Sequence, residues 1–119
     1  VKGLNKNAKS VRIPASVTIE GTVCKVIKIG KDAFKGYGKL TKVTLDKNIQ
    51  MIDKNAFLNC KKLKTITLKG KALKTVKSKA FKNTAKNLKV KAPKGMKKAQ
   101  KKKLLRILKK GGNKKIKVV

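Results

Sequence analysis

Few residues of this chain could take part in acid–base or metal chemistry. The 119-residue sequence contains no histidine, the side chain most often used as a general base, proton shuttle or metal ligand. Its acidic residues are only Glu20, Asp32, Asp46 and Asp53. Their spacing predicts no catalytic carboxylate pair, and together with two cysteines they match no metal-ligand pattern. The sequence therefore predicts a protein that is not an enzyme and that uses no metal or cofactor.

The two cysteines, Cys24 and Cys60, leave thiol chemistry to consider. Neither lies in a Cys-x-x-Cys motif, and two cysteines are too few for a disulfide framework. A single bridge stays open as an alternative, but it needs Cα atoms within about 7 Å of each other. The two residues lie more than one sequence repeat apart, so we expect free thiols, with Cys60 as a half-buried, small apolar group.

Positive charge dominates the composition. The chain has 36 lysines and arginines against four acidic residues, for a formal net charge of +32, and only Arg12 and Arg106 are arginines. Such a charge attracts nucleic acids, wall polymers, acidic glycans and anionic lipids. Base readout and bidentate phosphate binding favour arginine over lysine, however. The charge indicates at most an unspecific attraction to polyanions, and the scarcity of arginine disfavours nucleic acid as the partner. A merely solvated lysine surface is the simpler interpretation.

An internal repeat of 23 to 24 residues organises the chain. All three phenylalanines, Phe34, Phe57 and Phe81, occupy the same position in an Ala-Phe block. Each block is followed by a segment of alternating apolar and polar residues, which is typical of a strand with one buried face. These strands are expected at 43–45, 66–68 and 88–92. A unit this short cannot bury its own apolar face, so we expect stacked units, parallel strands and a ladder of phenylalanines in the core.

The Ala-Phe blocks carry the signals of a short turn. Asp, Asn or Ser stands just before each block, where it is suited to cap a one-turn helix. Gly36, Asn59 and Asn83 follow the phenylalanines by two residues and tolerate positive φ, so we expect them to end the turn. Cys60 occupies the next position and belongs to the same structural ladder.

The two ends of the chain differ from the repeats. Segments 17–19 and 23–27 alternate around Glu20-Gly21-Thr22, which predicts a hairpin covering the open edge of the first repeat. Residues 96–110 have helical periodicity, Gly111-Gly112 ends the helix, and 116–118 alternate as a last strand. Alone, this lysine-rich amphipathic helix could lie on an anionic membrane; in a stack, its apolar stripe closes the core. No apolar run approaches the 18 residues of a membrane span.

The motif Ile-x-x-x-Ala-Phe-x-x-Cys-x-x-Leu-x-x-Val-x-Leu, most complete at 52–68, resembles the BspA-like bacterial leucine-rich repeats. The resemblance covers roughly residues 8 to 119, although Tyr37 and Thr84 replace the motif cysteine in two copies. It implies an α/β repeat fold: a leucine-rich-repeat-type solenoid with short parallel strands, helical turns, an N-terminal hairpin cap and a C-terminal helix cap. It also implies a secreted or cell-surface bacterial protein that acts in adhesion or protein binding.

We therefore expect a single leucine-rich-repeat domain over residues 1–119. Within it, 1–28 form the N-terminal cap and first strand, 29–92 the repeats, and 93–119 the C-terminal cap helix and strand. The chain begins without Met or a signal-peptide core, so we expect that a targeting segment has been removed or that this is a piece of a longer protein. We also expect a monomer.

The outward side chains of the repeated strands are the candidate binding face, because solenoids present such a face as a regular surface. Val43 and Leu45 point inward by alternation, so their neighbours point outward in two columns. The first column is Ser10, Lys42, Thr65 and Lys89, and the second is Arg12, Thr44, Thr67 and Lys91. Both are polar and basic without an aromatic anchor. The leading hypothesis is a non-catalytic module for protein binding or adhesion; the alternative is electrostatic binding of a wall polymer, an acidic glycan or, less favoured, nucleic acid.

Overall fold

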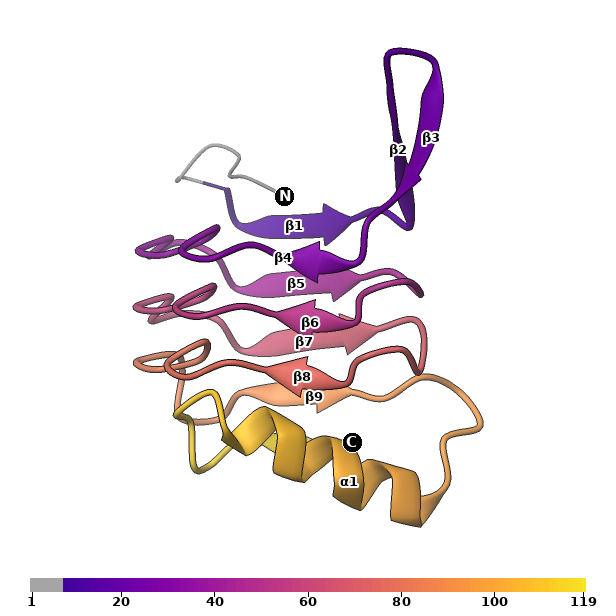
Figure 1. The fold of residues 1–119 in the computed structure, drawn as a ribbon. Coiled ribbons are helices and arrows are strands. Elements are labelled where there is room, and N and C mark those ends of the chain that lie inside the picture. Colours follow the sequence, from indigo (N-terminus) through magenta and orange to yellow (C-terminus); the bar gives the residue numbers. More distant parts are fainter. Residues whose placement is uncertain (1–7) are drawn as a thin grey trace.

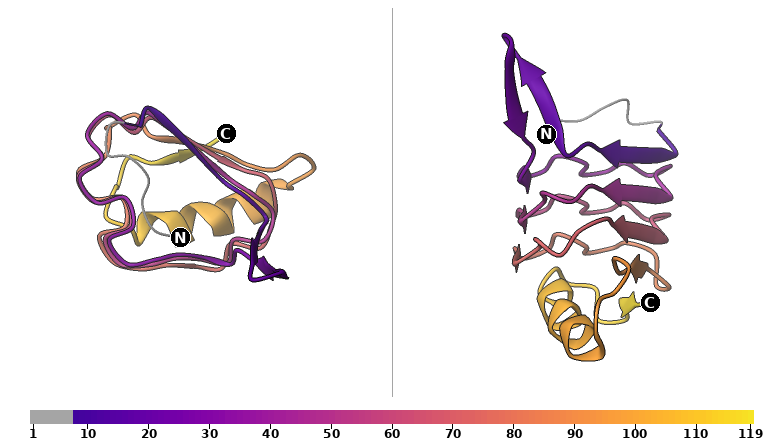
Figure 2. Two further views of the ribbon diagram at one scale, coloured as in Figure 1. Left: turned by 90° about the horizontal axis from the view of Figure 1, so that it is seen from above. Right: turned by 90° about the vertical axis from the view of Figure 1, so that its right-hand side faces the viewer.

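The computed structural model describes residues 8–119. The chain forms a stack of layers, and each of the first three layers contributes one strand to each of two parallel sheets (Figure 1). Seen along the stack, successive layers lie over one another (Figure 2). The larger sheet has the order β1-β5-β7-β9-β10, and the smaller one β4-β6-β8. The elements are β1 (Ser10–Ile13), β2 (Ser16–Ile19), β3 (Thr22–Lys25), β4 (Lys28–Ile29), β5 (Lys42–Leu45), β6 (Met51–Ile52), β7 (Thr65–Leu68), β8 (Thr75–Val76), β9 (Lys89–Lys91), α1 (Lys98–Lys109) and β10 (Lys117–Val118).

The register of the larger sheet follows the sequence period. Val43 pairs with Ile66, and Ile66 pairs with Val90, so equivalent residues of successive repeats are direct neighbours. All three side chains are fully buried, whereas the residues next to each of them along the strand are exposed or half-buried and point away from the core. The predicted parallel strands, each with one buried face, and the C-terminal helix are thus confirmed.

The Ala-Phe blocks are not helical, which corrects the expectation of helical turns. Their amides bond to carbonyls three residues back, as in Ala33 to Gly30, Lys35 to Asp32 and Tyr37 to Phe34. These are consecutive β-turns, because a residue with positive φ interrupts each block before a helix can form. The first position with positive φ in each block is occupied by Asp32, Asn55 and Lys79 in the three repeats, with φ of 59–61°. The other is Gly36, Asn59 and Asn83, as expected from the sequence, with φ of 77°, 61° and 59°.

The hairpin formed by β2 and β3 does not cover the edge of the first repeat. Its strands pair only with each other among the described residues, and the hairpin projects from the end of the stack (Figure 1). Every residue of β2 is exposed, including Ile19, and Val23 on β3 is 70% exposed. The Glu20-Gly21 turn has positive φ at both positions, as tight hairpin turns require, but this geometry does not determine where the hairpin points. Residues 1–7 of the predicted cap lie outside the described residues.

The C-terminal segment closes the other end of the stack. Helix α1 buries Leu104 and Leu108, and β10 extends the larger sheet by pairing with β9. Asn113, which the sequence pattern did not single out, lies in the segment between α1 and β10 and is buried. Its side-chain amide donates to the Thr84 hydroxyl at 2.8 Å and to the Ala85 carbonyl at 3.2 Å. The closing segment is therefore joined to the third repeat by part-buried side-chain hydrogen bonds as well as by apolar packing.

Gly111 continues the hydrogen-bond ladder that connects the Ala-Phe blocks. The amides of Phe34 and Phe57 donate to the carbonyls of Ala56 and Ala80 in the next layer, and Phe81 donates to Gly111, each at 2.8 Å. Gly111 lies so close to the last aromatic ring that a Cβ atom added there would stand 2.5 Å from Cδ2 of Phe81. Only a residue without a side chain fits at this point.

We expect Gly111→Ala to lower the free energy of unfolding by about 1–3 kcal/mol, the usual cost of overpacking a core. Chemical denaturation followed by circular dichroism measures this change. Gly38→Ala is the matched control, because a Cβ atom at Gly38 meets no atom within 4 Å. Equal stability of the two variants would contradict the close packing of Gly111 on Phe81.

Candidate binding face

The outer face of the larger sheet brings together all eight residues of the two predicted columns. Ser10, Lys42, Thr65 and Lys89 are successive Cα partners across β1, β5, β7 and β9, and so are Arg12, Thr44, Thr67 and Lys91. The lysines, Ser10 and Arg12 are exposed, and the three threonines are half-buried. Neighbouring strands are about 4.8 Å apart, so each column presents one side chain at that interval.

Lys117 extends the first column to a fifth strand. It is the Cα partner of Lys89, and its side chain is exposed. The sequence did not reveal this residue, because 28 positions separate it from Lys89 instead of the 23 or 24 of the repeat. The face therefore ends in two lysines that lie side by side.

Asp46 places a negative charge beside Arg12 of the second column. Its carboxylate accepts from the Lys47 amide at 2.7 Å and pairs with the Arg12 guanidinium at 3.4 Å. The Lys47 amide and, to a smaller extent, the Arg12 guanidinium lower the pKa of Asp46, against the opposing effect of desolvation. Arg12 remains 69% exposed, so it can still contact a partner from this position.

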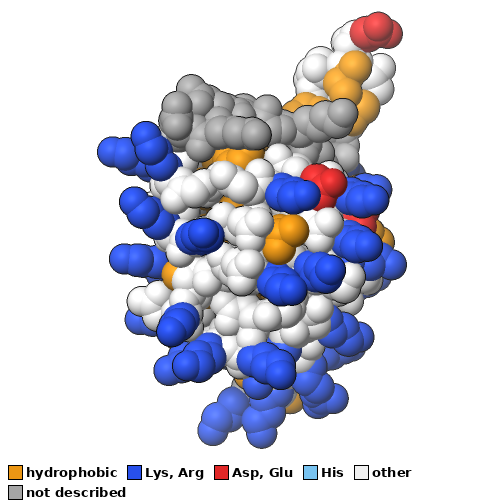
Figure 3. Space-filling view, turned by 90° about the vertical axis from the view of Figure 1, so that its left-hand side faces the viewer, with side chains coloured by type: hydrophobic (Ala, Val, Ile, Leu, Met, Phe, Trp, Pro, Cys, Tyr) orange, Lys and Arg blue, Asp and Glu red, His pale blue; other side chains and the backbone are white. Residues whose placement is uncertain are grey.

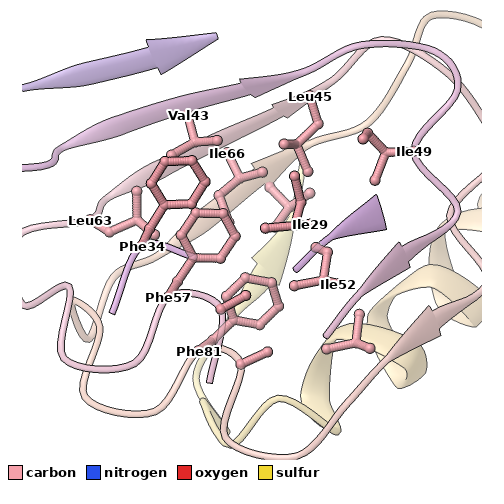
Figure 4. Close-up of a cluster of buried hydrophobic side chains, with 14 of the residues drawn as sticks. Ile29, Phe34, Val43, Leu45, Ile49, Ile52, Phe57, Leu63, Ile66 and Phe81 are labelled. Atoms are coloured by element: carbon pink, nitrogen blue, oxygen red, sulfur yellow. The ribbon is translucent and has the colours of Figure 1, made fainter. Parts of the chain in front are cut away.

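The core behind the face contains the aromatic ladder (Figure 4). The rings of Phe34, Phe57 and Phe81 stack with centroid distances of 5.3 and 5.8 Å and interplanar angles of 5° and 6°. Tyr37 meets Phe34 edge to face at 5.3 Å. All three phenylalanines are fully buried. They hold the layers in register and so fix the spacing of the outward columns, but none of them is available to a ligand.

Cys60 lies deeper than the half-buried position expected from its small side chain. It is fully buried, because the turn residues of adjacent layers enclose it, and its thiol donates to the Phe34 carbonyl at 3.0 Å. Desolvation by this burial raises the pKa of Cys60 to about 12. Cys24 is half-buried on the projecting hairpin, and the two thiols are not bonded.

We expect iodoacetamide at pH 8 to label Cys24 in the folded protein and to leave Cys60 unmodified. The raised pKa reduces the reactive thiolate of Cys60 by a factor on the order of a thousand, and burial also blocks access to the sulfur. Intact-mass spectrometry should show one adduct on the native chain and two after denaturation in guanidinium. Labelling of both residues at similar rates in the native state would contradict the buried position of Cys60.

Charge is distributed unequally along the stack. All four acidic residues precede Lys54, so every charged side chain from there to Val119 is basic. On the face drawn in Figure 3, lysines and arginines are spread over the whole stack down to its lower end, whereas acidic side chains appear only in the upper part. Within residues 8–119 the ion pairs are Arg12–Asp46 and Lys28–Asp53, both near the N-terminal end. The C-terminal end is therefore strongly electropositive.

The described part of the chain holds no cluster of three His, Cys, Asp or Glu side chains that could bind a metal ion. None of its helices is long and apolar enough to cross a membrane.

Comparisons with known proteins agree with this architecture. The family model for the BspA-type leucine-rich repeat region matches residues 5–105 with six copies. A leucine-rich cell-surface protein of Faecalibacterium prausnitzii is 28% identical, with a TM-score of 0.60 over 72% of this chain. A leucine-rich repeat protein of T. pallidum is 27% identical, with a TM-score of 0.63 over 81%. The chain covers 26% and 42% of these two proteins, respectively. The comparison with curated proteins found no match.

Proposed function

Because this chain belongs to the BspA-type leucine-rich repeat family, we propose that it is a non-catalytic, secreted or cell-surface module that binds protein partners or mediates adhesion. The observation that carries the proposal is the pair of outward columns, which run in register across four strands of the larger sheet. A stack of hydrogen-bonded layers presents such a surface with little backbone conformational entropy to lose on binding. The F. prausnitzii relative is described as a cell-surface protein, which supports the same location here.

The composition of the face limits the partners it suits. Its side chains are lysine, threonine, serine and one arginine, without the tryptophan or tyrosine that anchors most tight interfaces. Such a face favours an acidic, polar protein surface and gains more from electrostatic steering than from apolar burial. We therefore expect contacts with moderate affinity and a clear dependence on salt.

Arrays of proteins and glycans probed with this domain at physiological salt test the proposal. A face variant would carry Lys42→Glu, Lys89→Glu and Lys91→Glu. A control variant would carry Lys35→Glu, Lys61→Glu and Lys82→Glu, three exposed lysines of the Ala-Phe turns, so both variants change the net charge equally. Protein targets should be lost with the face variant and kept with the control. Equal loss with both variants, or no protein target at all, would reject this face.

A second candidate function is electrostatic binding of anionic polymers, and the absence of acidic residues after Asp53 favours it. Lysines without internal counterions condense anions and release them when a polyanion binds. On a heparin column, retention that persists above physiological salt would support this function. Elution below that concentration would mean that the positive charge attracts polyanions only incidentally and would count against this function.

A further inference from the structure

A hollow of about 470 Å³ lies at the C-terminal end of the stack, beside the last members of the first column. Leu105 and Ile116 form its apolar part. The lysines that surround it come from the end of the third repeat, helix α1 and the last strand with its preceding loop. They are Lys86, Lys89, Lys109, Lys114, Lys115 and Lys117. No acidic residue lines the hollow.

The fold places these lysine residues around one hollow without neutralising their charge. All six lysines are exposed, and neither ion pair of residues 8–119 involves any of them. Lys89 and Lys117 are direct partners on adjacent strands, where like charges destabilise a sheet. Uncompensated positive charge from three separate segments therefore surrounds one hollow.

We propose that this hollow binds a short segment of an anionic polymer with closely spaced phosphate or sulfate groups. The inference rests on the second candidate function and assigns it a site. Each such group offers several acceptor oxygens to ammonium donors, and lysine binds phosphate as a point charge. The hollow has room for a few groups but not for a long chain, and its position extends the first column. It contains no aromatic side chain on which a nucleobase could stack.

Two oligoanions of defined length test the site: linear tetrapolyphosphate and a heparin-derived tetrasaccharide. Binding to the whole domain would be measured by calorimetry at 20, 50 and 150 mM salt. The site variant carries Lys86→Gln, Lys109→Gln and Lys114→Gln, none of which belongs to the two columns. The control variant carries Lys35→Gln, Lys61→Gln and Lys62→Gln, so both lose the same charge.

We expect the site variant to bind about tenfold more weakly than the native chain and with a shallower salt dependence, because fewer counterions are released. The control should lose less than about threefold, since its lysines act only through the general field. Where the site variant is weakened more than the control, binding of tetrapolyphosphate alone identifies a phosphate polymer and binding of the tetrasaccharide alone a sulfated glycan; either result supports the site. Equal weakening of both variants would overturn it.

These measurements distinguish failure of the proposed hollow from failure of anionic-polymer binding, the function on which it rests. If both variants bind equally but heparin still retains the domain above physiological salt, the hollow is rejected and anionic-polymer binding over the whole surface stands. If heparin also fails to retain the domain, both proposals fall. Chemical shifts of the Leu105 and Ile116 methyl groups give a second measure, and they should move with ligand in the native chain and not in the site variant.

Discussion

Replacing Phe57 by alanine should lower the free energy of unfolding by about 3–5 kcal/mol, the largest effect we expect from any single truncation in this chain. Phe57 is fully buried in the middle of the aromatic ladder, with Phe34 at 5.3 Å on one side and Phe81 at 5.8 Å on the other. Its removal loses the transfer free energy of the ring and leaves a cavity that the two flanking layers cannot close. Stacking with both neighbours is lost as well.

Urea denaturation followed by circular dichroism measures this loss. Val23→Ala is a suitable control, because Val23 is apolar but 70% exposed on the projecting hairpin, and its truncation should change stability by less than about 0.5 kcal/mol. Repeat proteins can unfold layer by layer, so a broadened transition would itself show that the ladder couples the layers. A loss for Phe57→Ala as small as that of the control would contradict the ladder.

Sequence periodicity predicted the strands and their columns because one repeat corresponds to one layer. The distances from Phe34 to Phe57 and from Phe57 to Phe81 equal the distances between paired strand residues, so alignment of the repeats also aligns the sheet. Once the register is known, alternation determines which side chains point outward. This is why six of the eight residues of the face could be named from the repeat alone. Ser10 and Arg12 lie 32 residues before their partners and were named because segment 11–14 resembles the repeated strands. The role of all eight in binding stays a prediction.

The repeat pattern does not determine the conformation of the turns or the arrangement of the two ends of the chain. A residue that could cap a short helix can equally interrupt it, and Lys79, with φ of 61°, gives no sign of this in its residue type. The hairpin turn was recognisable, but its direction depends on tertiary contacts. Asn113 and Lys117 lie where the spacing changes, so alignment could not place them beside Thr84 and Lys89. The lysine hollow was missed for the same reason.

The loop that follows β7 packs closely against the loop that follows β5, and Gly70 lies at the contact. A Cβ atom at Gly70 would lie 2.7 Å from both Cα and the carbonyl oxygen of Lys47 in the preceding layer. Backbone atoms cannot move aside as a side chain can, so the two layers would have to separate locally. The amide of Lys69 donates to the Leu45 carbonyl at 2.9 Å, and this bond between the same layers opposes such a shift.

We therefore expect Gly70→Ala to cost about 1–3 kcal/mol of unfolding free energy, toward the upper end of the range for overpacking. Gly30→Ala is the matched control, because a Cβ atom there meets nothing within 4 Å, and it should leave stability unchanged or slightly raised. Thermal unfolding of the two variants and the native chain under identical salt makes the comparison. A Gly70→Ala variant as stable as the control would mean that adjacent layers can separate at this loop, and a binding face built on their fixed spacing would lose its physical basis.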